Sequence, residues 1–172
     1  NDGGDAKVIA IVKDNETVDS FSDGEAVIIL DKTVFYGEGG GQVGDKGNFN
    51  NGKIEVFDTK KTADGKYLHK CNILSGSVKV GDTVMCQIDT DYRRSIMRNH
   101  SATHLLRKAL REVLGTHVEQ SGSLVTADKL RFDFTHFSSM TSDELKEVED
   151  KVNNAILRAI EVDISEKRID EA

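Results

Sequence analysis

The sequence predicts an α+β protein, with a small antiparallel β-barrel at residues 1–90 and a helix, a β-hairpin and a second helix at residues 91–172. The first part holds many short runs rich in Val and Ile that are separated by turn-forming residues, a spacing typical of small barrels and sandwiches. After Asp89 the apolar residues recur at helical spacing instead. The chain has no Pro, so its turns depend on Gly, Asn and Asp.

Individual strands can be located in the first part. Residues 7–12 and 25–30 are short runs dominated by Val and Ile, which favour strands. Residues 78–89 alternate around a turn at Gly81 and Asp82, which predicts a further strand pair. Turn signals separate the strands at residues 14–15, 22–24, 50–52 and 63–65.

The second part begins with a long amphipathic helix. We expect it to start near Asp91 and to end at Gly115, a residue type common just after a helix. Its apolar side chains form one broad stripe at helical spacing, which predicts the buried face: Ala102, Leu105, Leu106, Ala109, Leu110 and Val113.

A hairpin and a second helix follow. In the second strand of the hairpin, Leu130, Phe132 and Phe134 alternate with polar residues, and residues 127–129 form the turn before it. Residues 141–144 form a capping box that opens the second helix. Its predicted buried stripe is Leu145, Val148, Val152, Ala155, Ile156 and Ala159. We expect residues 162–165 to begin another strand.

Composition limits the class of protein. With 37% hydrophobic and 31% charged residues, the 172-residue chain is expected to be globular and not disordered, and it has no apolar run long enough for a membrane span. The net charge of -7 argues against broad, non-specific nucleic-acid binding. Basic residues do line the first helix, where the sequence alone favours a solvated face: Arg93, Arg94, Arg98, Arg107, Lys108 and Arg111.

The cysteines and the first residues bear on the cellular location of the protein and on whether the chain is part of a longer one. Cys71 and Cys86 form no Cys-x-x-Cys pair, so we expect buried free thiols and a cytoplasmic location. The polar start carries neither a signal peptide nor an initiator Met. We therefore expect the chain to be a piece of a longer protein.

The strongest candidate for chemistry is the pair His100 and His104. At i and i+4 both imidazoles project from one helical face, nearly opposite the apolar stripe, and can reach one metal ion. Two ligands make only half of a tetrahedral zinc site, so a pair of solvated surface histidines stays an open alternative. Ser101 stands where zinc proteases have Glu, which disfavours peptide hydrolysis.

A glycine-rich segment lies within the β part, at residues 33–45, and contains Gly39, Gly40 and Gly41 in succession. It is not a P-loop, because no Gly-Lys-Ser/Thr follows and no helix opens after it. The three glycines favour a tight structural loop, and a loop that closes over a site is the alternative.

Four segments carry a resemblance to a known family: residues 35–42, 98–106, 120–123 and 131–136. Together they resemble the editing region of alanyl-tRNA synthetases, which free-standing alanyl-tRNA-editing proteins share, and the resemblance covers roughly residues 7–165. It implies hydrolysis of tRNA(Ala) mischarged with serine or glycine. A pocket that holds alanine cannot exclude glycine and discriminates weakly against one added hydroxyl, so a second, hydrolytic site is needed.

The resemblance also implies residue roles. His100 and His104 correspond to two zinc ligands, and Thr103 and Gln120 correspond to pocket residues that help to select serine. Ser123 is similar to a pocket-wall residue, and Gln42 is expected to line the same cleft. The partner is tRNA(Ala), while ATP and magnesium belong to the family's aminoacylation domain, which this chain lacks.

One departure from the family bears on zinc. The family completes its site with a later Cys-x-x-x-His segment, and this chain ends at Ala172 before such a segment. We therefore expect two of four ligands, weak or absent zinc binding, and an inactive fragment. Three other histidines are possible substitutes: His69, His117 and His136.

Several alternatives remain open at this stage. The chain is also compatible with a free-standing editing protein, with the related editing domain of threonyl-tRNA synthetases, or with a non-catalytic RNA-binding module. No covalent nucleophile is evident, and zinc would either activate a water molecule or orient the substrate through its amino group.

Overall fold

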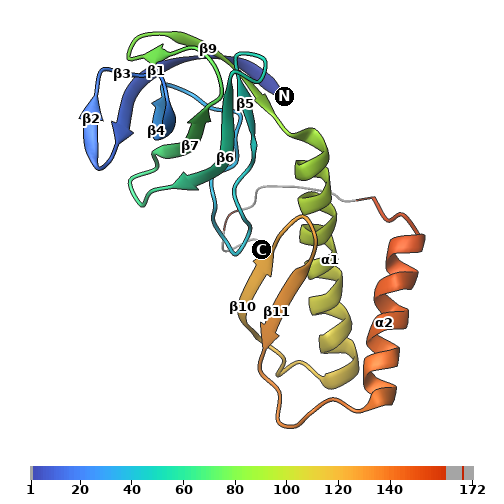
Figure 1. Cartoon of the computed structure of the whole chain (residues 1–172). Helices are drawn as coiled ribbons and strands as arrows, with labels where there is room; N and C mark the ends of the chain where they lie inside the picture. The colour runs from blue at the N-terminus through green and yellow to red at the C-terminus, as the bar shows by residue number, and fades with distance from the viewer. Residues whose placement is uncertain (1, 162–167, 169–172) are drawn as a thin grey trace.

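The chain forms a closed β-barrel at one end and a long helix that leaves the barrel and carries a hairpin and a second helix (Figure 1). This computed structural model describes residues 2–161 and 168, so the strand predicted at 162–165 lies outside the described residues. The elements of the barrel part are β1 (Gly3–Lys13), β2 (Glu16–Val18), β3 (Ser20–Phe21), β4 (Gly24–Leu30), β5 (Gly47–Phe49), β6 (Ile54–Lys61), β7 (Tyr67–Ile73), β8 (Val78–Lys79) and β9 (Thr83–Ile88). The remaining elements are α1 (Thr90–Leu114), β10 (Gln120–Val125), β11 (Leu130–Phe134) and α2 (Ser142–Leu157).

The barrel is antiparallel and follows the order β1-β4-β7-β6-β5-β9, with β9 returning to β1. Closure joins Gly3 to Gln87 and Lys7 to Thr83 in register, which removes the exposed edges of the sheet. The predicted barrel is thus confirmed. β1 begins before the predicted residue 7, because residues 3–7 pair with β9, a partner that is distant in the sequence.

One apolar core fills the barrel. Phe35, Phe49 and His69 pack edge to face within it, and Ile11 and Ile28 are fully buried. His69 is buried too, and both of its ring nitrogens are hydrogen-bonded, to the Thr33 hydroxyl at 2.8 Å and to the Ile28 carbonyl at 3.0 Å. Burial lowers the pKa of His69 to about 4, so this ring is neutral.

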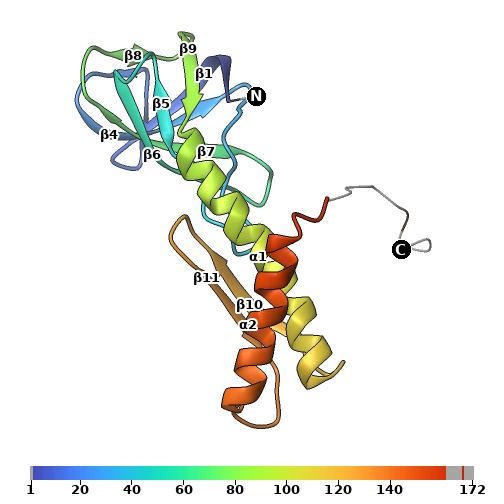
Figure 2. The same cartoon turned by 90° about the vertical axis from the view of Figure 1, so that its right-hand side faces the viewer.

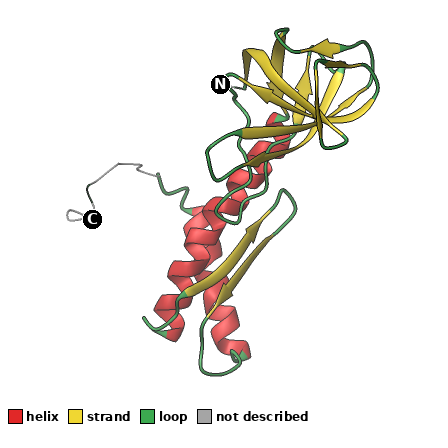
Figure 3. Cartoon of the chain, turned by 90° about the vertical axis from the view of Figure 1, so that its left-hand side faces the viewer, coloured by secondary structure: helices red, strands yellow, loops and turns green. Residues whose placement is uncertain are grey.

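The second part is built on α1. Asp89 caps the helix by accepting a hydrogen bond from the Tyr92 amide at 2.9 Å, and Gly115 ends it with φ +115°, close to the predicted bounds. The hairpin and α2 both pack against α1 (Figures 2 and 3). The predicted capping box at Thr141 and Glu144 is present. The buried centre of this part is Ala109, Leu110, Val118 and Val148.

The predicted buried stripe of α2 is wrong in three places. Val148 and Val152 pack toward α1 as expected, but Leu145 is 55% exposed and Ile156 is 52% exposed. Ala159 lies beyond the end of α2, in a left-handed conformation with φ 48°. Periodicity identifies apolar positions but not their partner, and α1 is the element against which α2 makes its extensive contact among the described residues. None of the helices described is both long enough and apolar enough to cross a membrane.

An ion pair fixes α1 to the barrel part. The Arg93 guanidinium, in the first turns of α1, donates to both carboxylate oxygens of Asp45 and to the Val34 carbonyl at 2.8 Å. Asp45 is 2% exposed and also accepts the Tyr36 amide at 2.6 Å. Both ends of the glycine-rich segment therefore meet the start of α1.

Replacing Arg93 by Met should lower the free energy of unfolding by about 3 kcal/mol, because the buried Asp45 carboxylate would lose its counter-charge. Urea denaturation measures the loss. The matched control is Arg94→Met, since Arg94 is 69% exposed and lies 3.9 Å from Asp91, a surface pair worth little. Equal, small losses in both variants would contradict this account of the joint.

Candidate functional site

The two helical histidines lie together on an exposed face of α1. The rings of His100 and His104 have centroids 5.2 Å apart, and both side chains are exposed. The expectation that they point away from the buried stripe is confirmed. Both imidazoles are therefore accessible to a shared ligand.

Gln42 reaches this pair from the glycine-rich segment. Its side-chain oxygen lies 2.7 Å from Nδ1 of His100, across 58 residues of sequence. Gln42 closes a tight turn in which Gly39 and Gln42 exchange backbone hydrogen bonds of 3.0 and 3.1 Å. Gly40 and Gly41 have φ +59° and +80°, values typical of a type I′ turn, which glycine adopts without strain. The segment is thus the tight loop that the glycines favoured, and it also delivers a side chain to the histidines.

The same turn pairs with the hairpin. The Val125 amide donates to the Gly41 carbonyl at 2.7 Å, and the Val43 amide donates to the Val125 carbonyl at 3.1 Å. A Cβ on Gly41 would lie 2.5 Å from the Ser123 carbonyl oxygen and would also meet the Ser123 hydroxyl. Gly41 is therefore required for close approach as well as for its positive φ.

Thr103, which directly precedes His104 in α1, is buried, whereas both histidines are exposed. Only 9% of it is exposed, and its hydroxyl donates to the Asn99 carbonyl at 2.9 Å. The side-chain amide of Asn99 donates to the backbone carbonyls of Thr126 and Ala127, at 2.9 and 3.2 Å. These two hydrogen bonds connect the tip of the hairpin to the helix. The role of Thr103 in selecting serine stays a prediction.

A polar groove runs beside the histidine face. It has a volume of about 430 Å³ and lies between α1 and β10, lined by Arg107, Arg111, Glu119, Gln120, Ser121 and Gly122. Arg107 and Arg111 follow His104 at i+3 and i+7, so they continue its face of the helix. Arg111 also donates to the Val118 carbonyl at 3.1 Å. Gln120 is exposed in this groove, while Ser123 lies farther along β10, beside Gly41.

A second groove borders His104 on its other side. It lies between α1 and α2, has a volume of about 770 Å³ and is mostly apolar: Met97, Arg98, Asn99, Ser101, Ala102, His104, Leu105, Ala155, Ile156 and Ile160 line it. Ala102 and Leu105, predicted as core, thus face a groove. His104 lines this apolar groove, and the polar groove begins one helical turn farther along α1, at Arg107.

The possible substitute ligands lie elsewhere. His69 is sealed in the barrel core, and His117 pairs with His136 at 2.9 Å between Nε2 and Nδ1. His117 also stacks on Phe137, with centroids 4.4 Å apart. Within residues 2–161 and 168, no group of three or more His, Cys, Asp and Glu side chains is placed to hold a metal ion.

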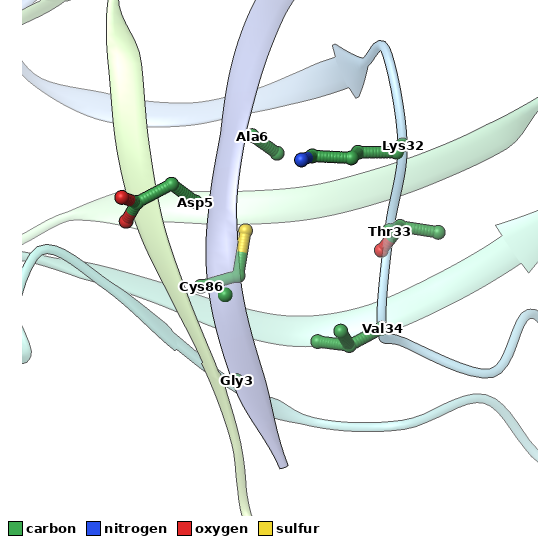
Figure 4. A pocket seen from close by; sticks show the side chains of 8 residues that line it. Gly3, Asp5, Ala6, Lys32, Thr33, Val34 and Cys86 are labelled. Atoms are coloured by element: carbon green, nitrogen blue, oxygen red, sulfur yellow. The ribbon is translucent and has the colours of Figure 1, made fainter. Parts of the chain in front are cut away.

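Both cysteines are buried free thiols, as predicted. Burial raises the pKa of Cys71, and it raises the pKa of Cys86 to about 11, so both thiols stay protonated. Cys86 lines a small pocket of about 200 Å³ on the barrel, with Gly3, Lys32 and Thr33 (Figure 4). This pocket shares no residue with the histidine face and contributes nothing to it.

Comparison with known proteins defines the class. Residues 3–92 match the sequence profile of the family "tRNA synthetases class II (A)". This match covers just over half of the chain, and the chain belongs to that family of tRNA synthetases.

The individual relatives are alanine–tRNA ligases. The chain is 55% identical over 170 residues to the alanine–tRNA ligase of Acetivibrio thermocellus, covering 97% of this chain and 19% of the relative. It is 51% identical over 172 residues to that of Clostridioides difficile, covering 98% and 20%. The ligase of Alkaliphilus oremlandii is 48% identical over 171 residues, covering 98% and 19%. The chain therefore spans about a fifth of the length of these curated relatives.

The contact of the glycine turn with β10 can be tested with two neighbouring glycines. Gly41→Ala should lower the free energy of unfolding by about 2–3 kcal/mol and shift the NMR signals of Ser123 and His100, because the new Cβ clashes at a strained φ. Gly40→Ala is the control, since its φ is also positive but nothing lies within 4 Å of its added Cβ. The Gly40→Ala variant should lower the free energy of unfolding by only about 1–2 kcal/mol and leave the signals of Ser123 and His100 unchanged. Identical effects of the two variants would refute a specific contact.

Proposed function

We propose that this chain is the editing portion of an alanine–tRNA ligase and hydrolyses the ester of tRNA(Ala) mischarged with serine or glycine. The observation that supports it most is the convergence of His100, His104 and Gln42 on one exposed face, beside a groove that holds Gln120. These parts belong to three of the segments on which the resemblance to editing regions rests. The parent enzyme would attach alanine to tRNA(Ala) with ATP and magnesium in the cytoplasm, using domains outside this chain.

Zinc fits the chemistry of the two histidines. Imidazole is a common zinc ligand, and in the exposed pair at i and i+4 each ring keeps a nitrogen with no hydrogen bond among the described residues. His100 and His104 would hold the ion together with ligands from outside this chain. When bound, zinc would supply either an activated water molecule or a contact that orients the substrate's amino group.

The reaction proposed is attack of water on the acyl carbon, with cleavage of the bond to the terminal ribose oxygen, which leaves free amino acid and tRNA. No side chain is needed as a covalent nucleophile. Thr103 in particular is buried, and its hydroxyl is engaged with the Asn99 carbonyl. Arg107 and Arg111 would hold phosphates of the single-stranded 3′ end in the polar groove, and Gln120 would contact the aminoacyl end.

Editing is tested by deacylation in a full-length enzyme. In the Acetivibrio thermocellus relative, this chain replaces the matching region, and hydrolysis of Ser-, Gly- and Ala-charged tRNA(Ala) is measured. We expect the serine and glycine esters to be cleaved selectively. The double variant His100→Ala, His104→Ala should lose more than about 100-fold in rate. Mutating a residue that merely hydrogen-bonds to a metal ligand already lowers metal affinity or activity by about 10–100-fold.

Glu112→Gln is the matched control, because Glu112 is exposed on the same helix and its ion pairs among the described residues are with surface lysines. The 172-residue chain alone is run alongside and should be far slower if its zinc site needs ligands from elsewhere. Absence of selective hydrolysis in the chimera, with tRNA still bound, would point to a binding module instead.

The polar groove gives a separate prediction for tRNA affinity. Arg107→Gln should weaken binding of tRNA(Ala) and reduce the slope of log affinity against log salt by about 0.7–1, the effect of one lost phosphate contact. Lys108→Gln is the control, because Lys108 is the next residue but is 78% exposed and lies beside Glu112. Fluorescence anisotropy at several salt concentrations measures both slopes. An unchanged slope for Arg107→Gln would exclude the groove as a phosphate site.

A further inference from the structure

We propose that Gln42 is a positioning residue that holds His100 in the tautomer with its proton on Nδ1, so that Nε2 presents a lone pair to the site. This inference deepens the proposed function and rests on it for its consequence, but its structural part can be measured without any enzyme activity.

The direction of the hydrogen bond follows from chemistry. The atom of Gln42 that lies 2.7 Å from Nδ1 of His100 is the amide oxygen, which can only accept a hydrogen bond. Nδ1 must therefore donate, and in the neutral ring Nε2 then carries no proton. An exposed histidine in water favours the opposite tautomer, so the contact selects the form that is less common in water.

Gln42 can exert this selection because its backbone is held on both sides. Its amide and carbonyl both bond to Gly39 within the turn. The residues before and after it, Gly41 and Val43, both bond to Val125 of β10. The turn has positive φ at Gly40 and Gly41, conformations in which glycine is strongly favoured. The side chain therefore starts from a rigid position and not from a loose loop.

The helix side of the contact is held as well. Arg93 precedes His100 by seven residues, two turns of helix, and so lies on the same face of α1. Its ion pair with Asp45 attaches that face to the residue that ends the glycine-rich segment. The distance between Gln42 and His100 is thus set by two anchors, one on each element.

Histidines that bind metals commonly donate their second ring N–H to an oxygen acceptor, which fixes the tautomer and strengthens the metal-binding nitrogen. Gln42 occupies that position for His100. His104 has no hydrogen bond to its ring among the described residues, so it serves as an internal comparison. The glycine-rich segment would then act on the site through the imidazole and not by touching the substrate.

The test is nitrogen-15 NMR of the histidine rings in the metal-free 172-residue chain, at a pH where the rings are neutral. We expect His100 to show a protonated Nδ1 and an unprotonated Nε2, and His104 to show the mixture usual in water. In Gln42→Leu the ring of His100 should revert toward the pattern of His104, a shift of about tenfold in tautomer ratio. Gln42→Glu keeps an acceptor and should retain the wild-type pattern.

The amide signals of Gly41 and Val125 report whether the turn stays docked, so that unfolding of the variant is not mistaken for loss of the contact. Zinc added to the wild-type chain should perturb Nε2 of His100, and Gln42→Leu should bind it about tenfold more weakly. A wild-type His100 that carries its proton on Nε2 overturns the proposal, because the amide would then donate to Nδ1. A tautomer unchanged in Gln42→Leu overturns it too.

The two proposals fail separately. If His100 has the expected tautomer but the chimera cleaves no mischarged tRNA, then the editing function is wrong and the positioning contact stands. If the chimera edits but Gln42→Leu changes neither the tautomer nor zinc affinity, then editing stands and Gln42 has no positioning role.

Discussion

The ion pair between Arg93 and Asp45 is the contact on which the arrangement of the site depends. Asp45, the last residue of the glycine-rich segment, is buried, and its carboxylate accepts from Arg93 and from the Tyr36 amide. Separating the two side chains would leave the buried Asp45 carboxylate without a counter-charge, which is energetically unfavourable. It joins the first turns of α1 to the barrel, and the rigid helix then carries His100 and His104 to fixed positions.

A second link makes that placement specific. An ion pair alone would allow α1 to pivot, but the glycine turn also pairs with β10, and β10 packs on α1 through its hairpin. Barrel, helix and hairpin therefore form a closed set of contacts around Gln42 and His100. Consecutive glycines are needed here because the turn requires positive φ and because Gly41 meets Ser123 without room for a Cβ. The unusual composition of the segment is thus explained by geometry.

Features that depend on residues close together in the sequence were predicted correctly. The bounds of α1, the capping box at Thr141 and the hairpin strands all follow from caps, turns and periodicity within a few residues. Exposure of His100 and His104 followed from helical spacing. Features that depend on contacts between distant segments could not be predicted from the sequence. They are the pairing of residues 3–7 with β9, the exposure of Leu145 and Ile156, and the burial of Thr103. The contact of Gln42 with His100 spans 58 residues, and only the resemblance to a family placed the two in one cleft.

The two grooves near His104 bear on how an ester substrate would lie. The groove on the α2 side is lined by apolar residues such as Met97, Leu105 and Ile156, and a phosphodiester entering it would lose hydration without gaining partners. The groove on the hairpin side offers Arg107 and Arg111 instead. Under the proposed function, the nucleotide end would therefore lie along the hairpin, with Gln120 near the aminoacyl group. The polarity of the two grooves would set the direction of the substrate, while Gln42 would set the state of the ring that meets it.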